Sequence, residues 1–448
     1  MISRVGSKKT GISMKPRQAF RLAVAFLCVT CLTLCAFGYS GATGGRDGNL
    51  IASASPALSE PLALAENIIG KARRPETIPA DLEFTIISTG DIMMHSPQTK
   101  AGWRQDSKDY DFSFMFEKVA PVLKEADLVI GNLETPLAGA SNGGFTGYPM
   151  FNAPDALAMN LRDAGFDLVS VANNHILDRQ FKGLSATLDV LDKAGLMHAG
   201  AYRTAEESAE ILHFEVKGAR LAAIAATYGT NGLKAPPDKA FAVNYIDEEK
   251  LLNGIARARR EGARYVIVML HWGEEYVTKP TARQEKLAMS LLRGGADLIL
   301  GNHPHVLQRG EIISLTEAAG TDGGADKAKE ASPSTTLITA GSKLVMYSQG
   351  NFISNQTGLD NVSGLLLKIT IGVRGDTGEP YLKDAGFIPV YTQRRDRSGA
   401  YKHTVWPIEL ALREIEAGSD IFNNEDRANI PKAWQRVIDS QPYLKLIP

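Results

Sequence analysis

Residues 297–305 read DLILGNHPH, an apolar run of the buried-strand type followed at once by two histidines with one proline between them. Four other segments have the same form, an apolar stretch that ends in Asp, Asn, Glu or His. They are FTIISTGD (84–91), DLVIGNLE (127–134), DLVSVANNH (167–175) and YVIVMLHW (265–272). In open α/β sheets the ligand crevice lies outside the carboxyl ends of the strands. The pattern therefore predicts that five segments present polar side chains at one edge of a sheet.

The polar side chains at these strand ends are of types that bind metal ions. They are Asp91, Glu134, Asn174, His271, His303 and His305. Imidazole, carboxylate and amide oxygen together suit Zn, Mn or Fe better than Ca or Mg. A single such motif is more often a structural histidine or a turn, but five in one context favour a metal centre. The remaining candidates, His198, His213 and His403, lack this context, and we interpret them as ordinary surface or packing residues.

Two residues beside the proposed ligands are candidates for chemistry on a substrate. A centre with several histidines and two acids lowers the pKa of bound water and polarises a phosphoryl oxygen. His175 follows Asn174 directly and is placed to act as a general acid or to hold the substrate. Asp178 is near enough in the sequence to orient His175. We therefore predict His175 and Asp178 as catalytic residues.

The composition is that of a globular protein without a nucleic-acid groove. The 448 residues are 44% hydrophobic and 22% charged, with a formal net charge of −1. A nucleic-acid groove would need a concentrated basic surface, so we predict no nucleic-acid partner. The three cysteines, Cys28, Cys31 and Cys35, all lie in one N-terminal apolar run. The body of the chain therefore contains neither a disulfide framework nor a thiolate metal site.

The N-terminus has the pattern of an export signal. A stretch rich in Arg and Lys, residues 1–21, precedes a nearly uninterrupted apolar run from Leu22 to Tyr39. The run is close to the roughly 20 residues that a helix needs to span a bilayer. Residues 1–40 are therefore either a cleaved signal peptide or a single retained membrane anchor. In both cases the positive flank places the body outside the cytoplasm, at the cell membrane or as a secreted or periplasmic protein.

The rest of the chain divides by composition. Residues 41–80 are rich in Gly, Ala, Ser and Pro and predict a flexible linker. From Asp81 to about residue 406, apolar strands alternate with amphipathic helices, which predicts an α/β domain. Thr316–Thr336 consists of small and polar residues without periodicity and is interpreted as an inserted loop.

Residues 407–448 predict a helical C-terminal extension, with helices at Ile408–Glu416 and near Ile430–Ser440. The helices predicted in the domain are Phe116–Ala126, Pro154–Ala164, Phe181–Ala194, Asp247–Glu261 and Thr281–Arg293.

Six short motifs, taken as an ordered set, resemble those of a known family. They are GD (90–91), GNLE (131–134), ANNH (172–175), HWG (271–273), GNHPH (301–305) and SQGNF (348–352). The set looks like that of the CapA family, the poly-γ-glutamate capsule synthesis proteins, and covers about residues 84–355. That family is similar to the calcineurin-like metallophosphoesterases, so the resemblance implies a sandwich of two β-sheets flanked by helices. It also implies a membrane-anchored protein that serves synthesis or export of an anionic polymer, together with membrane-embedded synthesis subunits.

The resemblance further implies two divalent transition-metal ions and a role for each ligand. One ion would take Asp91, Glu134 and His305, and the other would take Glu134, Asn174, His271 and His303. Two positions depart from the phosphoesterase pattern. Met93 stands where those enzymes usually have a histidine, and Glu134 stands where they have a bridging Asp. Whether His95 substitutes for the missing histidine stays open.

Two functions remain after this comparison. The first is a dinuclear metallohydrolase that acts on a phosphoryl or polymer bond at the envelope. The second is a non-catalytic subunit that holds metal or polymer while partner membrane proteins perform the chemistry. The intact ligand set favours the first function, and the departure at Met93 favours the second. In either case the predicted ligand is an anionic polymer or a phosphorylated substrate.

Overall fold

The computed structural model describes residues 82–315, 338–339 and 341–447. The predictions for residues 1–40, for the linker at 41–80 and for the loop at Thr316–Thr336 lie outside the described residues. Within the described ranges, no helix combines the length and the apolar character needed to cross a membrane.

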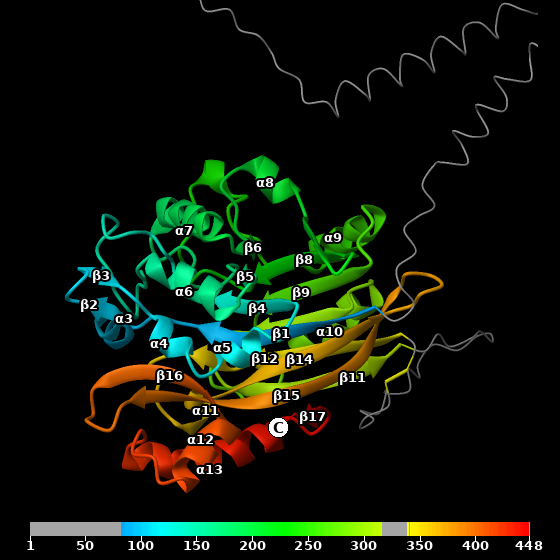
Figure 1. The fold of residues 1–448 in the computed structure, drawn as a ribbon. Coiled ribbons are helices and arrows are strands. Elements are labelled where there is room, and N and C mark those ends of the chain that lie inside the picture. The colour runs from blue at the N-terminus through cyan, green and yellow to red at the C-terminus, as the bar shows by residue number, and fades with distance from the viewer. Residues whose placement is uncertain (1–81, 316–337, 340, 448) are drawn as a thin grey trace, which may run out of the picture. The chain divides into compact units, whose positions relative to one another are not determined.

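Two β-sheets form the centre of the domain (Figure 1). The first, nine-stranded sheet has the order β16 (Tyr401–Pro407), β15 (Pro380–Arg395), β14 (Ser363–Val373), β1 (Glu83–Ile92), β4 (Leu128–Leu133), β5 (Leu168–Ser170) and β6 (Met197–Ala199), with β13 (Asn351–Ile353) beside β1 and β17 (Lys445–Leu446) beside β15. The second, six-stranded sheet has the order β11 (Leu307–Ser314), β12 (Ser342–Gln349), β10 (Leu298–Asn302), β9 (Tyr265–His271), β8 (Ala219–Thr227) and β7 (Leu212–Val216). A separate two-stranded ribbon pairs β2 (Trp103–Arg104) with β3 (Asp109–Tyr110).

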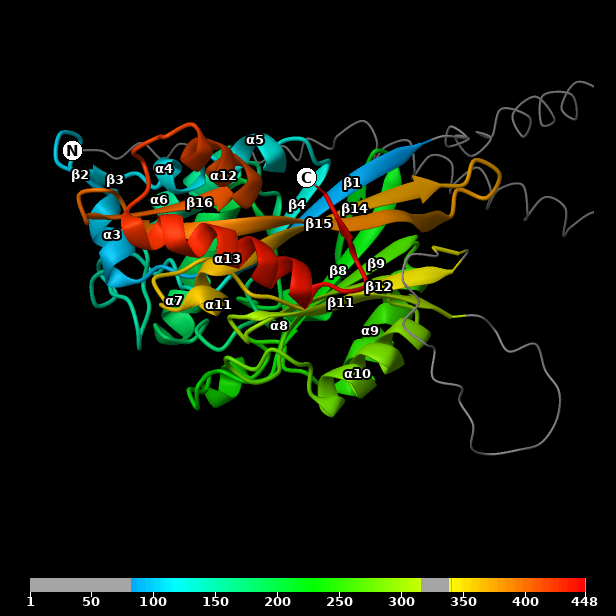
Figure 2. The ribbon, with the colours of Figure 1, turned by 90° about the horizontal axis from the view of Figure 1, so that it is seen from below.

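The helices are α3 (Ser96–Gly102), α4 (Ser113–Phe116), α5 (Ala120–Leu123), α6 (Ala156–Ala164), α7 (Gln180–Ala194), α8 (Ala205–Ala209), α9 (Glu248–Arg260), α10 (Ala282–Arg293), α11 (Leu359–Val362), α12 (Ile408–Glu416) and α13 (Asn424–Ser440), with a short 3-10 turn at Pro237–Lys239. Helices α4–α7 cover the outer face of the first sheet and α9 and α10 that of the second, whereas α12 and α13 pack onto the core between the sheets. In Figure 2, α13 lies along the strands of the first sheet, and it contacts β14, β15 and β11.

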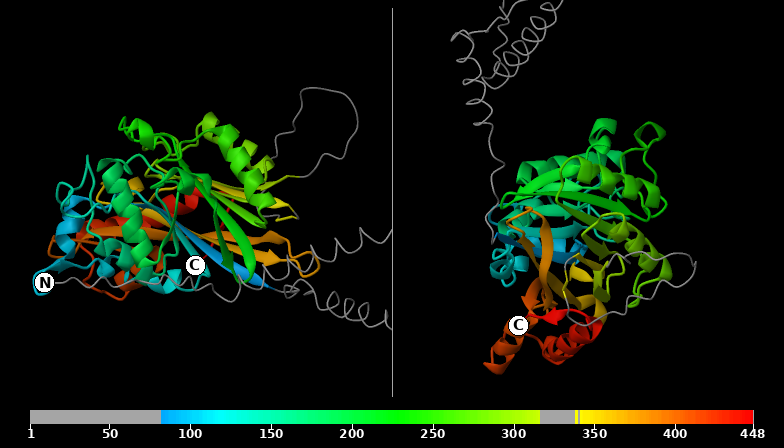
Figure 3. Two further views of the ribbon diagram at one scale, coloured as in Figure 1. Left: turned by 90° about the horizontal axis from the view of Figure 1, so that it is seen from above. Right: turned by 90° about the vertical axis from the view of Figure 1, so that its right-hand side faces the viewer.

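The alternation of side chains along each strand builds the layers. Successive residues of a strand point to opposite faces of its sheet. On β1, Ile86 lies in the core between the two sheets, whereas Ile87 lies in the core under α4–α7. On β9, Ile267 faces the core between the sheets and Val268 faces α9 and α10. The domain is thus a sandwich of two sheets between two helical layers (Figure 3), and the predicted fold class is confirmed.

Most predicted elements agree with the structure to within one or two residues, but two helices differ. The predicted single helix Phe116–Ala126 is wrong, because the chain there forms α4, a turn and α5. Proline lacks a backbone N–H and suits the first turn of a helix, so Pro121 opens a new helix instead of continuing the old one. The last helix begins at Asn424, earlier than Ile430, because the side chain of Asn423 caps it by accepting from the Asp426 N–H.

The parallel strands of both sheets end at the same side of the sandwich. In the first sheet β1, β4 and β5 run parallel, and in the second sheet β8, β9, β10 and β12 do. Asp91 lies near the end of β1, Glu134 follows β4, and His271 is the last residue of β9. The fold therefore brings strand ends from two different sheets to one place. The predicted division between residues 81–406 and 407–448 stays a prediction.

Candidate metal centre

All six predicted ligands meet at this common edge and are buried. Asp91, Glu134 and His271 are at most 1% exposed. The donor atoms of Asp91, Glu134 and His305 lie within 4.8 Å of one another, and so do those of Glu134, His271 and His303. Glu134 belongs to both groups, and apart from Asn174 the two groups match the two ligand sets that the family resemblance implies. The Oδ1 of Asn174 lies 3.0 Å from the Nε2 of His271, which brings the sixth predicted ligand to the second group.

Direct contacts link the donors of the two groups. The Nδ1 of His305 lies 3.0 Å from the Oδ2 of Asp91, and its Nε2 lies 3.8 Å from the Oε1 of Glu134. The Nε2 of His271 lies 3.5 Å from the same Oε1 of Glu134. His303 has a positive φ of 102°, and so has His305 at 59°. With this backbone, a ring nitrogen of His303 lies within 4.8 Å of Glu134, and one of His305 lies within 4.8 Å of both Asp91 and Glu134.

Two neighbouring amides hold the ligands in place, and neither of them was predicted. The Nδ2 of Asn132 donates to Asp91 Oδ1 at 2.8 Å and lies 3.2 Å from the Nδ1 of His271. Asn132 thus spans the two sheets and orients a ligand on each of them. The Nδ2 of Asn173 donates to the carbonyl oxygen of Leu133 at 2.8 Å, which fixes the segment that carries Glu134. Asn132 stands in the quoted GNLE motif, but its position before the acid gave no sign of this role.

The centre combines two buried carboxylates with several imidazoles, and the pKa values reflect the burial. Burial, together with the charge of Asp91, holds the pKa of Glu134 well above its usual value. Burial alone would raise the pKa of Asp91, but the hydrogen bond and charge of His305 outweigh it and lower that pKa. Burial lowers the pKa of His271 to about 3 and that of His303 to about 2. Burial also opposes the charged form of His305, but Glu134 and Asp91 raise its pKa to about 9.

Several buried donor atoms have no hydrogen-bond partner within the described residues. Both carboxylate oxygens of Glu134 are unpartnered, and so is the Nδ1 of His303. Buried polar atoms are normally hydrogen-bonded, and an unpaired buried carboxylate is costly. A divalent ion in each donor group would supply the missing partner, because carboxylate oxygen and imidazole nitrogen are ordinary metal ligands. The residues present therefore fit two bound ions.

The predicted catalytic pair lies beside this centre. The Nδ1 of His175 is 2.7 Å from the Oδ2 of Asp178, and both side chains are buried. Asp178 also accepts from the backbone N–H of Phe151 at 2.7 Å, which fixes the carboxylate. The ring of Phe151 packs edge-on against the ring of His175, with 4.6 Å between centroids. His175 is thus held in one orientation, with Nε2 as the ring nitrogen that Asp178 leaves unused.

His95 lies near the centre but outside both donor groups. Its Nδ1 is 3.3 Å from Gln98 Oε1 and accepts from the backbone N–H of Asn355 at 3.3 Å. Burial lowers the pKa of this imidazole to about 4. Met93, at the position where a histidine is usual, is buried and 2% exposed. His95 therefore caps the start of α3 together with Gln98, and whether it is also a metal ligand stays open.

Three exposed residues around the centre were not predicted from the sequence as parts of the site. A carboxylate oxygen of Glu275, which is exposed, lies within 4.8 Å of nitrogens of His303 and His305. The ring of Tyr228 packs on the ring of His303 at 4.4 Å between centroids, and Tyr276 lies 6.0 Å from the ring of His305. Burial and the charge of Glu275 raise the pKa of Tyr228 to about 12, so its hydroxyl stays protonated at neutral pH. The segment EEY, residues 274–276, directly follows the HWG motif. This position in the sequence could have indicated that Glu275 and Tyr276 lie near the centre.

Comparison with known proteins identifies relatives of this chain. The profile of a family described as "Bacterial capsule synthesis protein PGA_cap" matches residues 85–356. The capsule biosynthesis protein CapA of Bacillus anthracis is 31% identical over 237 residues, which are 51% of this chain and 56% of that protein. The PGA biosynthesis protein CapA of Bacillus subtilis is 31% identical over 255 residues, or 55% of this chain and 64% of that protein. The match thus spans less than two thirds of either relative.

Two solved structures resemble the chain more distantly. The calcineurin-like phosphoesterase YfkN from Bacillus subtilis has a TM-score of 0.38 at 13% identity, and covers 80% of this chain and 98% of its own. A putative 5'-nucleotidase from Staphylococcus aureus has a TM-score of 0.41 at 10% identity, over 79% of this chain and 58% of its own. Both TM-scores are low, so the assignment of the fold follows from the two sheets themselves.

Proposed function

This chain belongs to the family of bacterial capsule synthesis proteins, and from this premise we propose that it serves synthesis or export of a capsule-type anionic polymer with a centre of two divalent metal ions. The observation that carries the metal centre is Glu134. Its two oxygens are buried without a hydrogen-bond partner among the described residues, and it belongs to both donor groups. A carboxylate shared by two ions would account for both features.

The chain's own residues would bind and orient two ions of Zn, Mn or Fe. Asp91, Glu134 and His305 would hold one ion, and Glu134, Asn174, His271 and His303 the other. Bound there, such ions supply Lewis-acid activation of a phosphoryl oxygen and lower the pKa of a water molecule. His175, oriented by Asp178, would move a proton at Nε2 or bind a substrate oxygen there. The proposed reaction is hydrolysis of a phosphoryl or polymer bond.

Metal analysis of the purified full chain tests the centre directly. The protein is purified without chelator, supplied with Zn or Mn, and freed of unbound metal. We expect about two equivalents of metal per chain. A content below one equivalent would show that the dinuclear centre is wrong.

A non-catalytic subunit is the second candidate, and the surroundings of β1 favour it. Met93 replaces a histidine that phosphoesterases usually have, and His95 is engaged with Gln98 and Asn355. A chain that binds two ions but hydrolyses neither bis-p-nitrophenyl phosphate nor a poly-γ-glutamate chain would support this reading. Membrane-embedded synthesis subunits would then perform the chemistry. Polymer ligase genes beside the gene for this chain would support the capsule role under either reading.

The proposed location is outside the cytoplasm, at the cell membrane or released from it. The basic flank and apolar run of residues 1–39 support this location, because they suit an export signal or an anchor. A reporter that works only outside the cytoplasm, fused after Pro448, should be active. Activity of a reporter that works only in the cytoplasm would contradict the topology. Mass spectrometry of the mature N-terminus would distinguish an anchor from a cleaved signal.

A further inference from the structure

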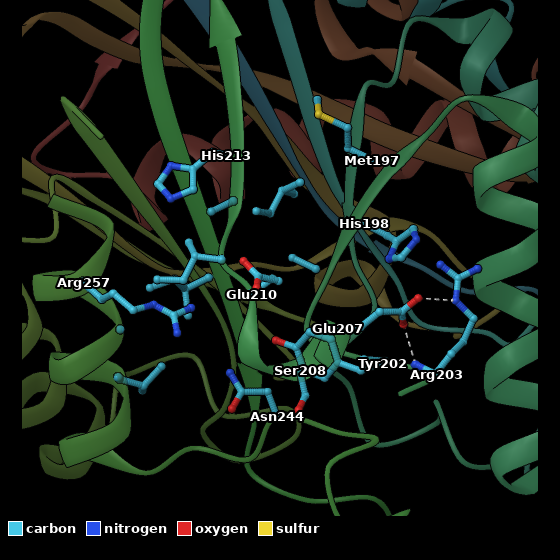
Figure 4. A pocket seen from close by; sticks show the side chains of 18 of the residues that line it. Met197, His198, Tyr202, Arg203, Glu207, Ser208, Glu210, His213, Asn244 and Arg257 are labelled. Atoms are coloured by element: carbon cyan, nitrogen blue, oxygen red, sulfur yellow. Dashed lines mark hydrogen bonds and ion pairs between the residues drawn. The ribbon is translucent and has the colours of Figure 1, made fainter. Parts of the chain in front are cut away.

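A cavity of about 1100 Å³ opens at the side of the sandwich where the edge strands of the two sheets face each other, and none of the candidate metal ligands lines it. Its walls come from β6, from β7 and β8, and from the helices α8 and α9 (Figure 4). Cavities that bind small molecules typically hold about 300–1,000 Å³. We propose that this cavity binds an amphipathic anion, a molecule with one carboxylate or phosphate group on an apolar body.

The inner part of the cavity is apolar. Leu196, just before β6, and Ala199 of β6 line it on one side, Leu212 and Ala223 line it from the second sheet, and Leu251 lines it from α9. Small alanine side chains at two of these positions leave space between the sheet edges. An apolar body would therefore be removed from water on contact with both sheets, which is favourable in proportion to the area buried.

A glycine in the middle of α9 keeps this space open. Gly254 lies in the interior of the helix and lines the cavity. Apart from proline, glycine is the least favourable residue in a helix interior. A Cβ built on Gly254 would meet only the Cδ1 of Ile224 within 4 Å, at 3.3 Å. The local packing would thus accommodate a methyl group with a small adjustment, whereas a larger side chain would extend into the cavity.

The cationic side chains of α9 that line the cavity would bind the anionic head group. Lys250, Arg257 and Arg260 stand on the face of α9 that also carries Gly254, and all of them line the cavity. Arg257 makes one long contact, 3.4 Å from its Nε to Glu261 Oε1. Lys250 and Arg260 form no ion pair with any residue that the structure describes. A carboxylate or phosphate would give this face the charge-assisted hydrogen bonds that it lacks.

Most acidic groups around the cavity are already paired with cations. On the opposite side, Arg203 binds Asp192 at 2.6 Å and Glu207 at 2.9 Å, and Figure 4 shows Arg203 and Arg257 on opposite sides of the cavity. Glu261 is bound by the Nε2 of His213 at 2.8 Å. Glu210 is the lining acid that has no ion pair in the described part of the chain, and it lies beyond the end of α8. The head group is therefore expected on the α9 side of the cavity, away from Glu207.

Binding of single-chain probes to the full chain tests the proposal. Dodecanoate and dodecyl phosphate, below their micelle concentrations, are titrated by calorimetry, with dodecylammonium as the probe of opposite charge. We expect saturable binding of at least one of the two anions near one equivalent, and the tighter anion identifies the head group. Gly254→Leu should abolish this binding. Arg257→Leu should weaken it about tenfold or more, the range for loss of a charged hydrogen bond.

A matched control is Arg293→Leu, the same change at an exposed arginine of α10 that does not line the cavity, and it should bind like the wild type. Circular dichroism and metal content check that each variant is folded, and neither should change in Gly254→Leu. The proposal fails if no anion binds, if dodecylammonium binds as tightly as the anions, or if Gly254→Leu binds like the wild type. A chain that lacks bound metal but binds the anions would contradict the proposed metal centre only.

Discussion

His305 and Asp91 stand 214 positions apart in the chain, yet the Nδ1 of His305 lies 3.0 Å from the Oδ2 of Asp91. Asp91 lies near the end of β1 in the first sheet, and His305 follows β10 in the second. Both side chains are at most 2% exposed, so the contact joins the two sheets in a region without bulk water. Both residues are proposed ligands of one ion. The candidate centre therefore depends on the packing of one sheet on the other.

Substitution of Glu134 is expected to lower the metal content of the chain more than any other single substitution. Glu134→Gln removes the shared carboxylate from both donor groups, and the neutral amide is a weaker ligand. We expect the metal content to fall from about two equivalents to less than one, measured on the purified chain. Glu125→Gln is the matched control, because it makes the same change at an exposed glutamate outside both groups, and it should keep the wild-type content. Full metal content in Glu134→Gln would contradict the bridging role.

Asp178→Asn should separate metal binding from turnover. Asp178 contacts neither donor group but holds the Nδ1 of His175 at 2.7 Å. The variant should retain its metal and lose about 10²–10⁴-fold in the hydrolysis of bis-p-nitrophenyl phosphate, the range for loss of a general acid or base. Asp192→Asn, which alters an analogous carboxylate contact to the partly exposed His198, serves as the control and should keep its rate. Equal rates in both variants would contradict the proposed role of the His175–Asp178 pair.

A side chain at Gly90 should destabilise the fold beside the centre. A Cβ on Gly90 would overlap the carbonyl oxygen of Gly350, which accepts from the Asp91 N–H at 2.9 Å. Because the obstacle is backbone, we expect Gly90→Ala to lower the free energy of unfolding by about 1–3 kcal/mol. Urea unfolding of the full chain measures this change. Gly229→Ala is the control, since a Cβ there meets nothing within 4 Å, and an equal loss in both variants would refute the steric explanation.

The ionisation of Asp426 is expected to lower the free energy of unfolding as the pH rises. Burial raises the pKa of this carboxyl to about 6, and its Oδ1 accepts from the Tyr391 hydroxyl at 2.9 Å. A carboxyl with a raised folded-state pKa stabilises the fold below its unfolded pKa of about 3.9, and this contribution is lost as the pH rises through about 6. In Asp426→Asn the amide oxygen can still accept from Tyr391, so the variant should gain stability relative to the wild type from pH 4 to pH 7. Parallel urea unfolding at both pH values measures this difference, and an unchanged difference would contradict it.

The sequence predicted that the six proposed ligand side chains come together, because a local pattern encodes it. Each ligand follows an apolar strand, and parallel strands of one sheet bring such residues to one edge. Helix ends were predicted for a similar reason: Gly195, with a φ of 74°, takes the left-handed conformation that ends α7. Where a local signal was missed or misread, the prediction failed, as at Pro121, which starts a helix instead of continuing one.

The contacts between segments that carry no common signal in the sequence followed from the three-dimensional packing alone. Asn132 orients Asp91 and His271 because two sheets stack face to face, and no spacing in the sequence encodes that stacking. Glu275 reaches His303 and His305 only because the turn after β9 is joined to the HPH turn, where the Tyr276 N–H donates to the Pro304 carbonyl at 2.8 Å. The cavity beside Gly254 depends on how far the two edge strands stand apart. Periodicity and motifs report the environment of one segment at a time, whereas distances between segments follow from the packing of the whole core.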